Sequence, residues 1–406
     1  MPKSWNGTLL LYSHGYRADT GIGPGSPELS QSDQLGNGSD PVSKALFDKG
    51  YALAGSSYPS AGWAVHGAVL AAEQLYRRFV QRVGRPKHVY VWGSSLGGLI
   101  TEVLAEHETW VDGAAPMCGV VAGPLLNFDN VLDAAVAIRA LLVPSLKVNG
   151  WSSVVEGLTE LNRATSAITK AATDTTHGGG AKIVYLVTML GLPTTMNFPG
   201  STPRSIASAA GQALTGYITA GFTSEFGAER QFGGKPAQSD SLAQPADAAL
   251  GAVVAKLGGD SASYAQTVAS AAPVDADPAA RAALEKSGDP TGALRVPTVT
   301  MHTVYDPVVI SSNETILRNR VAVHQQSARL RQLYIAPPSS YDPRKGSPYG
   351  LGHCAFTTEQ MTGLIGVLDA FVRHDDRLGT SAVTHLMGPG LAPTFLPAGW
   401  PSGAER

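Results

Sequence analysis

The sequence predicts an α/β fold, in which a mainly parallel, doubly wound sheet is interrupted by a large helical insertion. Three observations lead to this prediction. Short apolar runs alternate with amphipathic helical stretches in the first 120 residues, as in strand–helix–strand units. The alternation stops over residues 121–294, where only helical patterns and Gly/Ala/Ser-rich joints are found. It resumes after residue 295, which indicates that the later strands complete the same sheet.

The first part of the predicted sheet contains four strands, each a short apolar run of the kind found in a parallel sheet covered on both faces. These runs are Thr8–Ser13, Tyr51–Ser57, His88–Trp92 and Asp112–Cys118. The helical patterns between them are Pro41–Lys49, Trp63–Val83 and the segment that follows Ser95. A Gly-, Pro- and Ser-rich stretch from Arg17 to about Asp40 is expected to be a surface loop.

The remainder of the chain divides into an insertion and the second part of the core. Residues 1–120 and 295–406 are predicted to form the core domain, and residues 121–294 a helical cap. Helices in the cap are expected over Phe128–Leu142, Val154–Ala172, Ile183–Leu190, Ile206–Tyr217 and Ala246–Lys256. Two further strands, Val296–Thr303 and Leu330–Ala336, precede a last amphipathic helix, Glu359–Arg373. Two independent domains are the alternative, but the sheet would then lack its last strands.

Composition excludes several classes of partner. The 406-residue chain has a formal net charge of -2 and no clustered Lys or Arg, so a nucleic-acid partner is not expected. No run reaches 18 apolar residues, so no membrane span is expected. No secretory leader is visible before the first strand, which fits either a cytoplasmic protein or a mature secreted one. The sequence does not indicate the oligomeric state.

Gly93-Ser94-Ser95-Leu96-Gly97 fits the pattern G-x-S-x-G and lies between a predicted strand and a predicted helix. A nucleophilic serine at this position needs a sharp, strained turn, and small residues on either side let the strand and helix approach closely. The helix that follows also directs its first N–H groups toward developing negative charge. Ser95 is therefore the candidate nucleophile. An ordinary Gly-rich strand–helix turn is the alternative.

A serine nucleophile needs a base, and the base needs an orienting acid. Asp306 follows the strand that ends at Thr303, and His353 lies in a loop between the last strand and the final helix. Both follow Ser95 in the order Ser, Asp, His. Of the other nine histidines, only His177 is also expected in a loop, and it precedes Asp306. Asp306 and His353 are thus the candidate acid and base.

The oxyanion hole is expected to use the N–H of Leu96 and one N–H from the loop after the first strand, which we assign to Tyr16. His14 is expected to pack beneath this loop rather than to carry a proton. No metal or organic cofactor is expected. The acidic residues of the first long loop, Asp19, Asp33 and Asp40, do not have the spacing of a calcium motif.

These motifs resemble the α/β-hydrolase superfamily, especially its bacterial secreted esterase, lipase and peptidase branches with a Gly-His-Cys triad loop. The matching segments are Ser13–Tyr16, Gly93–Gly97, Pro297–Pro307 and Gly352–Cys354. The resemblance covers about 120 residues at each end and leaves the insertion unmatched. It implies a serine hydrolase with a cap over the active site. It also favours a secreted protein over the cytoplasmic alternative.

The resemblance also bears on the two cysteines, Cys118 and Cys354. Tannase and feruloyl esterase relatives join a cysteine before the nucleophilic serine to one after the histidine, but here Ser94 occupies the first position. A Cys118–Cys354 disulfide would instead fix the His353 loop to the sheet. Two buried thiols are the alternative.

The function expected from these residues is hydrolysis of carboxylic esters through an acyl-enzyme, with a small-molecule ester as the substrate. The apolar cap helices favour medium or bulky hydrophobic groups. A peptidase or amidase is one alternative and would need cap residues that bind a substrate terminus, with Glu156, Glu160, Glu225 and Glu229 as candidates by composition. Acyl transfer or cyclisation of a natural product in a water-excluding site is another.

Overall fold

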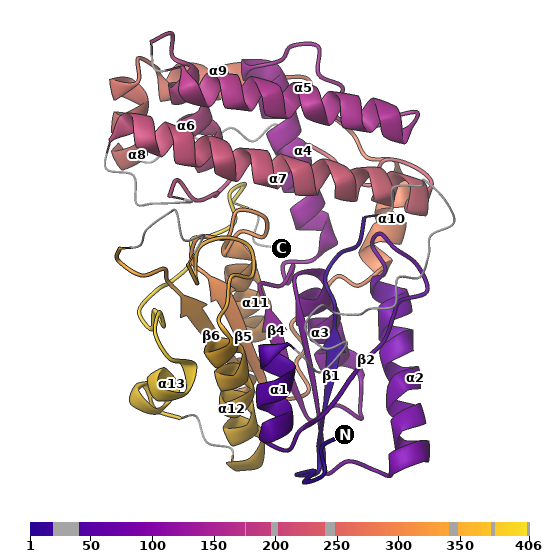
Figure 1. Cartoon of the computed structure of the whole chain (residues 1–406). Coiled ribbons are helices and arrows are strands. Elements are labelled where there is room, and N and C mark those ends of the chain that lie inside the picture. Colours follow the sequence, from indigo (N-terminus) through magenta and orange to yellow (C-terminus); the bar gives the residue numbers. More distant parts are fainter. Residues whose placement is uncertain are drawn as a thin grey trace.

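The computed structural model describes residues 1–18, 40–174, 176–195, 202–239, 248–340, 348–374 and 378–403. In these residues the strands form one parallel six-stranded sheet with the order β2-β1-β3-β4-β5-β6 (Figure 1). The strands are β1 (Thr8–Ser13), β2 (Ala52–Gly55), β3 (His88–Ser94), β4 (Gly113–Met117), β5 (Thr298–Thr303) and β6 (Leu330–Ile335).

Helices cover both faces of the sheet, because successive side chains of each strand point to opposite sides. Leu9 and Leu11 of β1 belong to the apolar core that includes helices α2, α3 and α11, whereas Leu10 and Tyr12 belong to the core under α1 and α12. The flanking helices are α1 (Pro41–Asp48), α2 (Val65–Val83), α3 (Leu96–His107), α11 (Ser312–Val323), α12 (Thr358–His374) and α13 (Thr380–Met387), with a 3-10 turn η1 (Ser327–Arg329).

The strand order changes direction between β1 and β3. The chain runs from β1 outward to β2 and then crosses back to β3 on the other side of β1. In an open parallel sheet, ligands bind beyond the carboxyl ends of the strands at such a switch point. The Ser95 turn follows β3 at this place. With the serine turn after a central strand, this topology is the α/β-hydrolase fold, and the predicted fold class is confirmed.

The insertion lies between β4 and β5, and Figure 1 shows helices α5 to α9 stacked beyond the carboxyl ends of the strands. Its helices are α4 (Pro124–Leu141), α5 (Val154–Thr173), α6 (Gly179–Met189), α7 (Pro203–Phe232), α8 (Ala248–Lys256), α9 (Ser261–Ala269) and α10 (Pro278–Lys286). β4 pairs directly with β5, with Met117 opposite Met301, so one sheet continues on both sides of the insertion. The division at residues 120 and 295 into a core and a cap domain stays a prediction.

Helix α7 differs most from its predicted extent. It was expected to end at Tyr217 but continues to Phe232, where Gly233 adopts a left-handed conformation at φ 72°. Glycines and threonines give the second half of this helix a low intrinsic helix propensity. Burial of its apolar side chains against α4, α5 and α6 compensates. Local propensity was thus overridden by packing.

Other differences concern shorter elements. Helices α9, α10, α11 and α13 were not predicted, so the helix at Glu359–Arg373 is not the last one. In the eight-residue α13 only Val383 and Met387 are buried, which is too short a stripe to recognise in a sequence. The expected loop from Arg17 to Asp40 lies largely outside the described residues, and so do Asp19 and Asp33. Asp40 caps α1 by accepting the N–H groups of residues 42 and 43.

Across the described ranges, every helix is too short or too polar to cross a bilayer.

Candidate active site

Ser95 lies on a sharp turn between β3 and α3. Its backbone has φ 60° and ψ -124°, a conformation that non-glycine residues keep only where their surroundings enforce it. Both glycines of the motif are required by packing. A Cβ atom on Gly93 would lie 2.6 Å from the carbonyl oxygen of Ser13, and one on Gly97 would overlap the same oxygen. The motif therefore allows β1, β3 and α3 to come close enough to form the turn.

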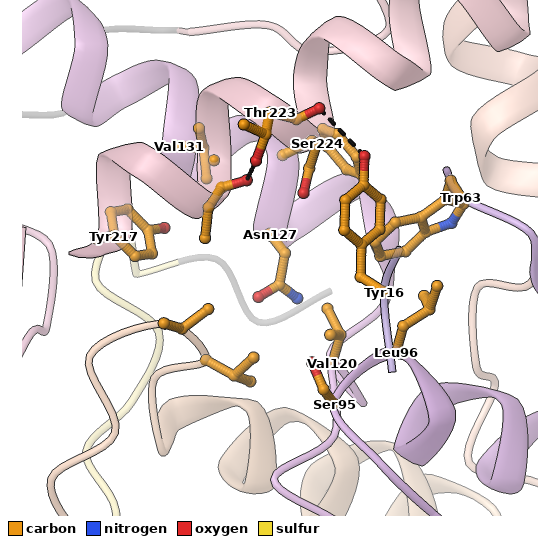
Figure 2. Close-up of a pocket in the computed structure, with 15 residues that line it drawn as sticks. Tyr16, Trp63, Ser95, Leu96, Val120, Asn127, Val131, Tyr217, Thr223 and Ser224 are labelled. Carbon is orange, nitrogen blue, oxygen red and sulfur yellow. Dashed lines mark hydrogen bonds between the residues drawn. The ribbon is translucent and has the colours of Figure 1, made fainter. Parts of the chain in front are cut away.

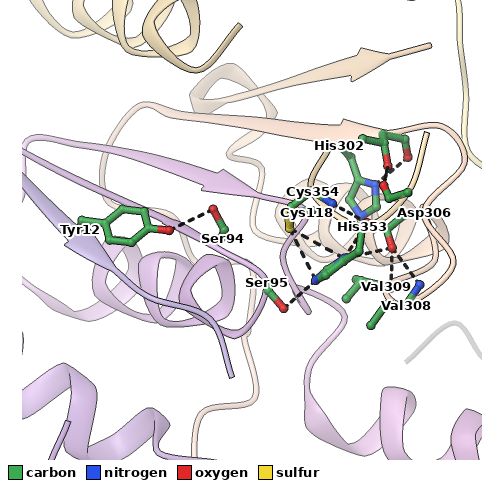
Figure 3. Close-up of a disulfide and its surroundings, with 12 residues drawn as sticks. Tyr12, Ser94, Ser95, Cys118, His302, Asp306, Val308, Val309, His353 and Cys354 are labelled. Atoms are coloured by element: carbon green, nitrogen blue, oxygen red, sulfur yellow. Dashed lines mark hydrogen bonds and ion pairs between the residues drawn. A yellow bond between two sulfur atoms is a disulfide. The ribbon is translucent and has the colours of Figure 1, made fainter. Parts of the chain in front are cut away.

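The structure brings the three predicted residues Ser95, His353 and Asp306 together (Figure 3). Nε2 of His353 is 2.9 Å from Ser95 Oγ, and Nδ1 of His353 is 2.8 Å from Asp306 Oδ2. Asp306 follows β5, and His353 lies between β6 and α12. If Nδ1 carries the proton, it donates to Asp306 and leaves Nε2 to accept the Ser95 hydroxyl. The arrangement is competent for removal of the serine proton.

The Asp306 carboxylate is only 1% exposed and is held by the backbone that follows it. The N–H groups of Val308 and Val309 each donate to its Oδ1 at 2.9 Å. Burial alone would raise the pKa of Asp306, but the facing His353 and the Val309 N–H outweigh it and bring the pKa below its usual value. Asp306 is therefore ionised at neutral pH and orients the imidazole.

A disulfide joins Cys118, directly after β4, to Cys354, directly after His353 (Figure 3). The two Cα atoms are 5.5 Å apart, so of the two alternatives considered for these cysteines, a disulfide or two buried thiols, the structure has the disulfide. Cys354 Sγ lies 3.5 Å from Nε2 of His353, and the hydroxyl of Thr303 donates to the carbonyl of Gly352 at 3.0 Å. The loop carrying His353 is thus fixed to the sheet both covalently and by hydrogen bonds.

The same three residues, Cys118, His353 and Cys354, place potential metal-ligand atoms within 4.8 Å of one another. Metal ligation by cysteine requires a thiolate. The two sulfurs are bonded to each other instead, so this group does not fit a metal site.

The two residues predicted for the oxyanion hole line the same cavity as Ser95. Leu96 is the first residue of α3, so its N–H has no acceptor within the helix. Tyr16 belongs to the loop that follows β1. His14 packs as predicted: its ring stacks on Tyr58 with 3.7 Å between centroids, and burial lowers its pKa. The role of the Leu96 and Tyr16 N–H groups stays a prediction.

The cavity beside Ser95 has a volume of about 120 Å³ and lies between the core and the insertion (Figure 2). Ser95 and Val120 lie on one side of it, and Thr223 and Ser224 of α7 lie opposite. Most of its walls are apolar side chains from both parts of the chain, namely Trp63, Leu96, Val120, Phe128, Val131, Val308 and Val309.

Two contacts hold α7 over the cavity. The Tyr16 hydroxyl donates to the Thr223 carbonyl at 3.1 Å. The Gln231 side chain accepts from the N–H of Trp63 at 3.1 Å and donates to its carbonyl at 2.9 Å. No motif in the sequence identifies these residues or the cavity walls, because they depend on how the insertion packs against the core.

The four glutamates considered as terminus-binding groups do not line this cavity. Glu156 pairs with Lys147, and Glu160 with Arg163. Glu229 accepts the N–H of Gly150 at 2.6 Å, and Glu225 is only 2% exposed. Burial raises the pKa of Glu225 well above its usual value. Glu156, Glu160 and Glu229 are therefore engaged in contacts within the insertion, and Glu225 is enclosed there.

No protein-family model and no curated protein matches this chain in sequence. Among solved structures, it is similar to the rice cell wall degrading esterase LipA from Xanthomonas oryzae, at 15% identity and a TM-score of 0.38, over 82% of this chain and 75% of that one. It is also similar to an esterase from Aspergillus oryzae, at 15% identity and a TM-score of 0.42, over 92% and 76% of the two chains. A third similar structure is feruloyl esterase B from Aspergillus oryzae, at 10% identity and a TM-score of 0.40, over 93% of this chain and 79% of that one. The fold assignment rests on the strand order and the serine turn described above.

Proposed function

We propose that this chain, which has the α/β-hydrolase fold, is a serine hydrolase that cleaves carboxylic esters through an acyl-enzyme. The observation that carries the proposal is the continuous hydrogen-bonded series from Ser95 Oγ through His353 to Asp306. It lies beside an apolar cavity that can receive part of a substrate.

Acylation begins when Nε2 of His353 takes the Ser95 proton and Oγ attacks the ester carbonyl. The carbonyl oxygen becomes an oxyanion, which the N–H groups of Leu96 and Tyr16 stabilise. Asp306 stabilises the imidazolium. When the tetrahedral intermediate collapses, the alcohol leaves with the proton from Nε2 and the acyl group stays on Ser95.

Deacylation repeats these steps with water. Nε2 of His353 takes a proton from the water as its oxygen attacks the acyl-enzyme carbonyl. The second tetrahedral intermediate releases the carboxylic acid, and Ser95 Oγ recovers its proton from His353. Protons balance over the cycle, so the mechanism needs neither a metal nor an organic cofactor.

We favour ester hydrolysis over a peptidase function because of the side chains that line the cavity. A peptidase that recognises a substrate terminus needs a charged group near the nucleophile, and among the residues that the structure describes, those lining the cavity carry no ionised side chain. Acyl transfer to another alcohol would use the same acyl-enzyme. Product analysis with and without an added alcohol separates it from hydrolysis.

We also propose that the protein acts outside the cytoplasm. Disulfides form and persist in oxidising compartments and are rare in the cytosol. The bridge from Cys118 to Cys354 adjoins the base, so the proposed activity would depend on its oxidation.

The experiment is labelling with a fluorophosphonate, combined with hydrolysis of p-nitrophenyl esters and aminoacyl-p-nitroanilides. Wild-type protein should be labelled and should hydrolyse the esters in preference to the anilides. Ser95→Ala should abolish labelling and lower kcat by about 10⁴-fold or more. Ser94→Ala is the matched control, because Ser94 accepts a hydrogen bond from Tyr12 and lies outside the series.

Two results would contradict the proposal. Labelling that persists in Ser95→Ala would show that another residue is the nucleophile. Faster cleavage of the anilides than of the esters would favour the peptidase alternative.

A further inference from the structure

One face of helix α7 forms the wall of the cavity across from Ser95 (Figure 2). Four of the lining residues, Tyr217, Ala220, Gly221 and Ser224, follow one another at the three- and four-residue spacing that brings side chains to one face of a helix. Ala220 and Gly221 lie one turn before Ser224 and carry almost no side chain, so they leave space beside its hydroxyl. The Ser224 hydroxyl is thereby presented to the cavity.

The Ser224 hydroxyl differs from the other hydroxyl and amide groups of the cavity wall. Those groups all bond to the protein, and they belong to Tyr16, Ser95, Asn127, Tyr217 and Thr223. The indole N–H of Trp63 is fully buried and is not exposed to the cavity. Within the part of the chain that the structure describes, the Ser224 hydroxyl makes no hydrogen bond. It therefore has both a donor and an acceptor available to a ligand.

The neighbouring residue shows that this arrangement is not a general property of α7. A serine or threonine within a helix commonly bonds its hydroxyl to a backbone carbonyl one turn earlier. The Thr223 hydroxyl does so, donating to the Thr219 carbonyl at 2.8 Å. Ser224 makes no such bond, so without a ligand its hydroxyl has only water as a partner.

Filling the cavity removes that water, and the consequence depends on the chemistry of the substrate. An alkyl group placed against Ser224 would leave its hydroxyl unpaired among mainly apolar walls, which is costly. A neutral oxygen would restore the lost hydrogen bond. A charged group would not be compensated, because none of the described residues lining the cavity carries an ionised side chain.

We propose that Ser224 is a specificity-determining residue that donates a hydrogen bond to a neutral oxygen of the substrate. The protein then prefers esters that carry an ether, hydroxyl or second carbonyl oxygen over plain alkyl esters of the same size. The inference rests on the proposed ester hydrolysis and specifies its substrate class. Because Ser95, Val308 and Val309 all line the same cavity, either half of the ester can carry this oxygen.

The experiment compares esters that differ only by an oxygen in place of a methylene. On the acyl side, p-nitrophenyl methoxyacetate is compared with p-nitrophenyl butyrate. On the alcohol side, 2-methoxyethyl acetate is compared with butyl acetate. Each pair is also extended by one and by two methylenes, which moves the oxygen farther from the ester carbonyl. The oxygen preference of an enzyme is the kcat/KM of the ether ester divided by that of its hydrocarbon counterpart.

Ser224→Ala should lower the oxygen preference by about fivefold in at least one pair, which corresponds to the loss of one neutral hydrogen bond. Differences in intrinsic reactivity between the esters cancel when the variant is compared with the wild type. The loss should come mainly from a higher KM, because the contact is made equally in the ground state and the transition state.

Two further variants separate the hydrogen bond from other effects. Ser224→Cys keeps a side chain of similar size but offers only a weak donor, so it should lower the oxygen preference in the same pair. Ser208→Ala is the matched control, because Ser208 is an exposed serine of the same helix that does not line the cavity. Its oxygen preference should equal that of the wild type.

The outcomes are distinguishable from failure of the proposed function. Ser95-dependent hydrolysis with the same oxygen preference in wild type and Ser224→Ala, for every pair, would overturn the role of Ser224 and leave the esterase proposal intact. An equal loss of kcat/KM for ether and hydrocarbon esters in Ser224→Ala would also overturn it. Absence of Ser95-dependent ester cleavage in the wild-type protein would instead refute the esterase proposal itself.

Discussion

At the scale of single residues, Tyr16 has two distinct connections to the site. Its backbone belongs to the loop expected to supply an oxyanion donor, and its ring forms part of the cavity wall. Its hydroxyl also donates to the Thr223 carbonyl of α7. The position of α7 is thereby coupled to the position of a backbone N–H near Ser95.

We expect Tyr16→Phe to lower kcat while KM changes little. The variant keeps the aromatic wall but loses one hydrogen bond, worth about 1 kcal/mol, so kcat for p-nitrophenyl butyrate should fall about fivefold. The control is Tyr76→Phe, because Tyr76 stacks on Trp110 and does not line the cavity. A Tyr16→Phe variant with wild-type kcat would show that the loop keeps its position without this contact.

At the scale of elements, the segment after α10 fastens the insertion to the core. Glu106 of α3 accepts the N–H groups of Thr291 and Gly292, at distances of 2.6–3.0 Å. Arg320 of α11 donates to the Pro290 carbonyl at 2.7 Å and lies 3.5 Å from Asp289. Two helices of the core therefore hold the chain as it returns to β5.

Asp289 makes this joint sensitive to pH. Burial raises its pKa to about 6, although Arg320 opposes the shift. Because the folded-state pKa lies above the unfolded one, its contribution to stability is complete below pH 4 and is lost as the pH rises from about 4 to 6.

Asp289→Asn should remove this pH dependence, since asparagine stays neutral. Between pH 4.5 and 7.5, wild-type protein should lose roughly 2 kcal/mol of unfolding free energy relative to the variant. Urea unfolding at both pH values measures this difference, with the exposed Asp275→Asn as control. Parallel pH dependences of wild type and Asp289→Asn would contradict it.

At the scale of the whole molecule, the disulfide closes a span of 236 residues that contains the entire insertion. It joins the end of β4 to the residue after His353. In the chain-entropy model, a loop of this length stabilises the folded state by about 5 kcal/mol.

Replacing both cysteines, Cys118→Ala and Cys354→Ala, should therefore lower Tm by about 6 °C, as measured by calorimetry. Ester hydrolysis should fall by about ten- to a hundred-fold, because small displacements of a catalytic group are costly. Reduction of the wild-type protein should reproduce the loss, and reoxidation should reverse it. A double variant with unchanged kcat would show that hydrogen bonds alone position His353.

The sheet and the candidate triad were accessible to sequence analysis because their signals are local. β1 coincides with its predicted apolar run, and the Ser95 motif lies at the predicted strand–helix junction. Asp306 and His353 could be proposed from their order and their place after strands. The disulfide, which the family resemblance suggested, is also present.

The cavity could not be predicted from the sequence, and the reason is physical. Its walls combine Trp63 with residues of α4 and α7, and these meet only after the insertion has packed against the core. The second half of α7 has weak helix propensity and is stabilised by tertiary contacts. Nothing local distinguishes the apolar residues of α4 that line the cavity from those that do not.

The long sequence separation between Ser95 and His353 also means that the two residues are synthesised at different times. During synthesis the nucleophile emerges 258 residues before the base. At roughly 5–20 residues per second, this interval lasts roughly 13–50 seconds. The disulfide can form only after Cys354 has followed. A complete set of the three candidate residues therefore exists only after His353 has been synthesised.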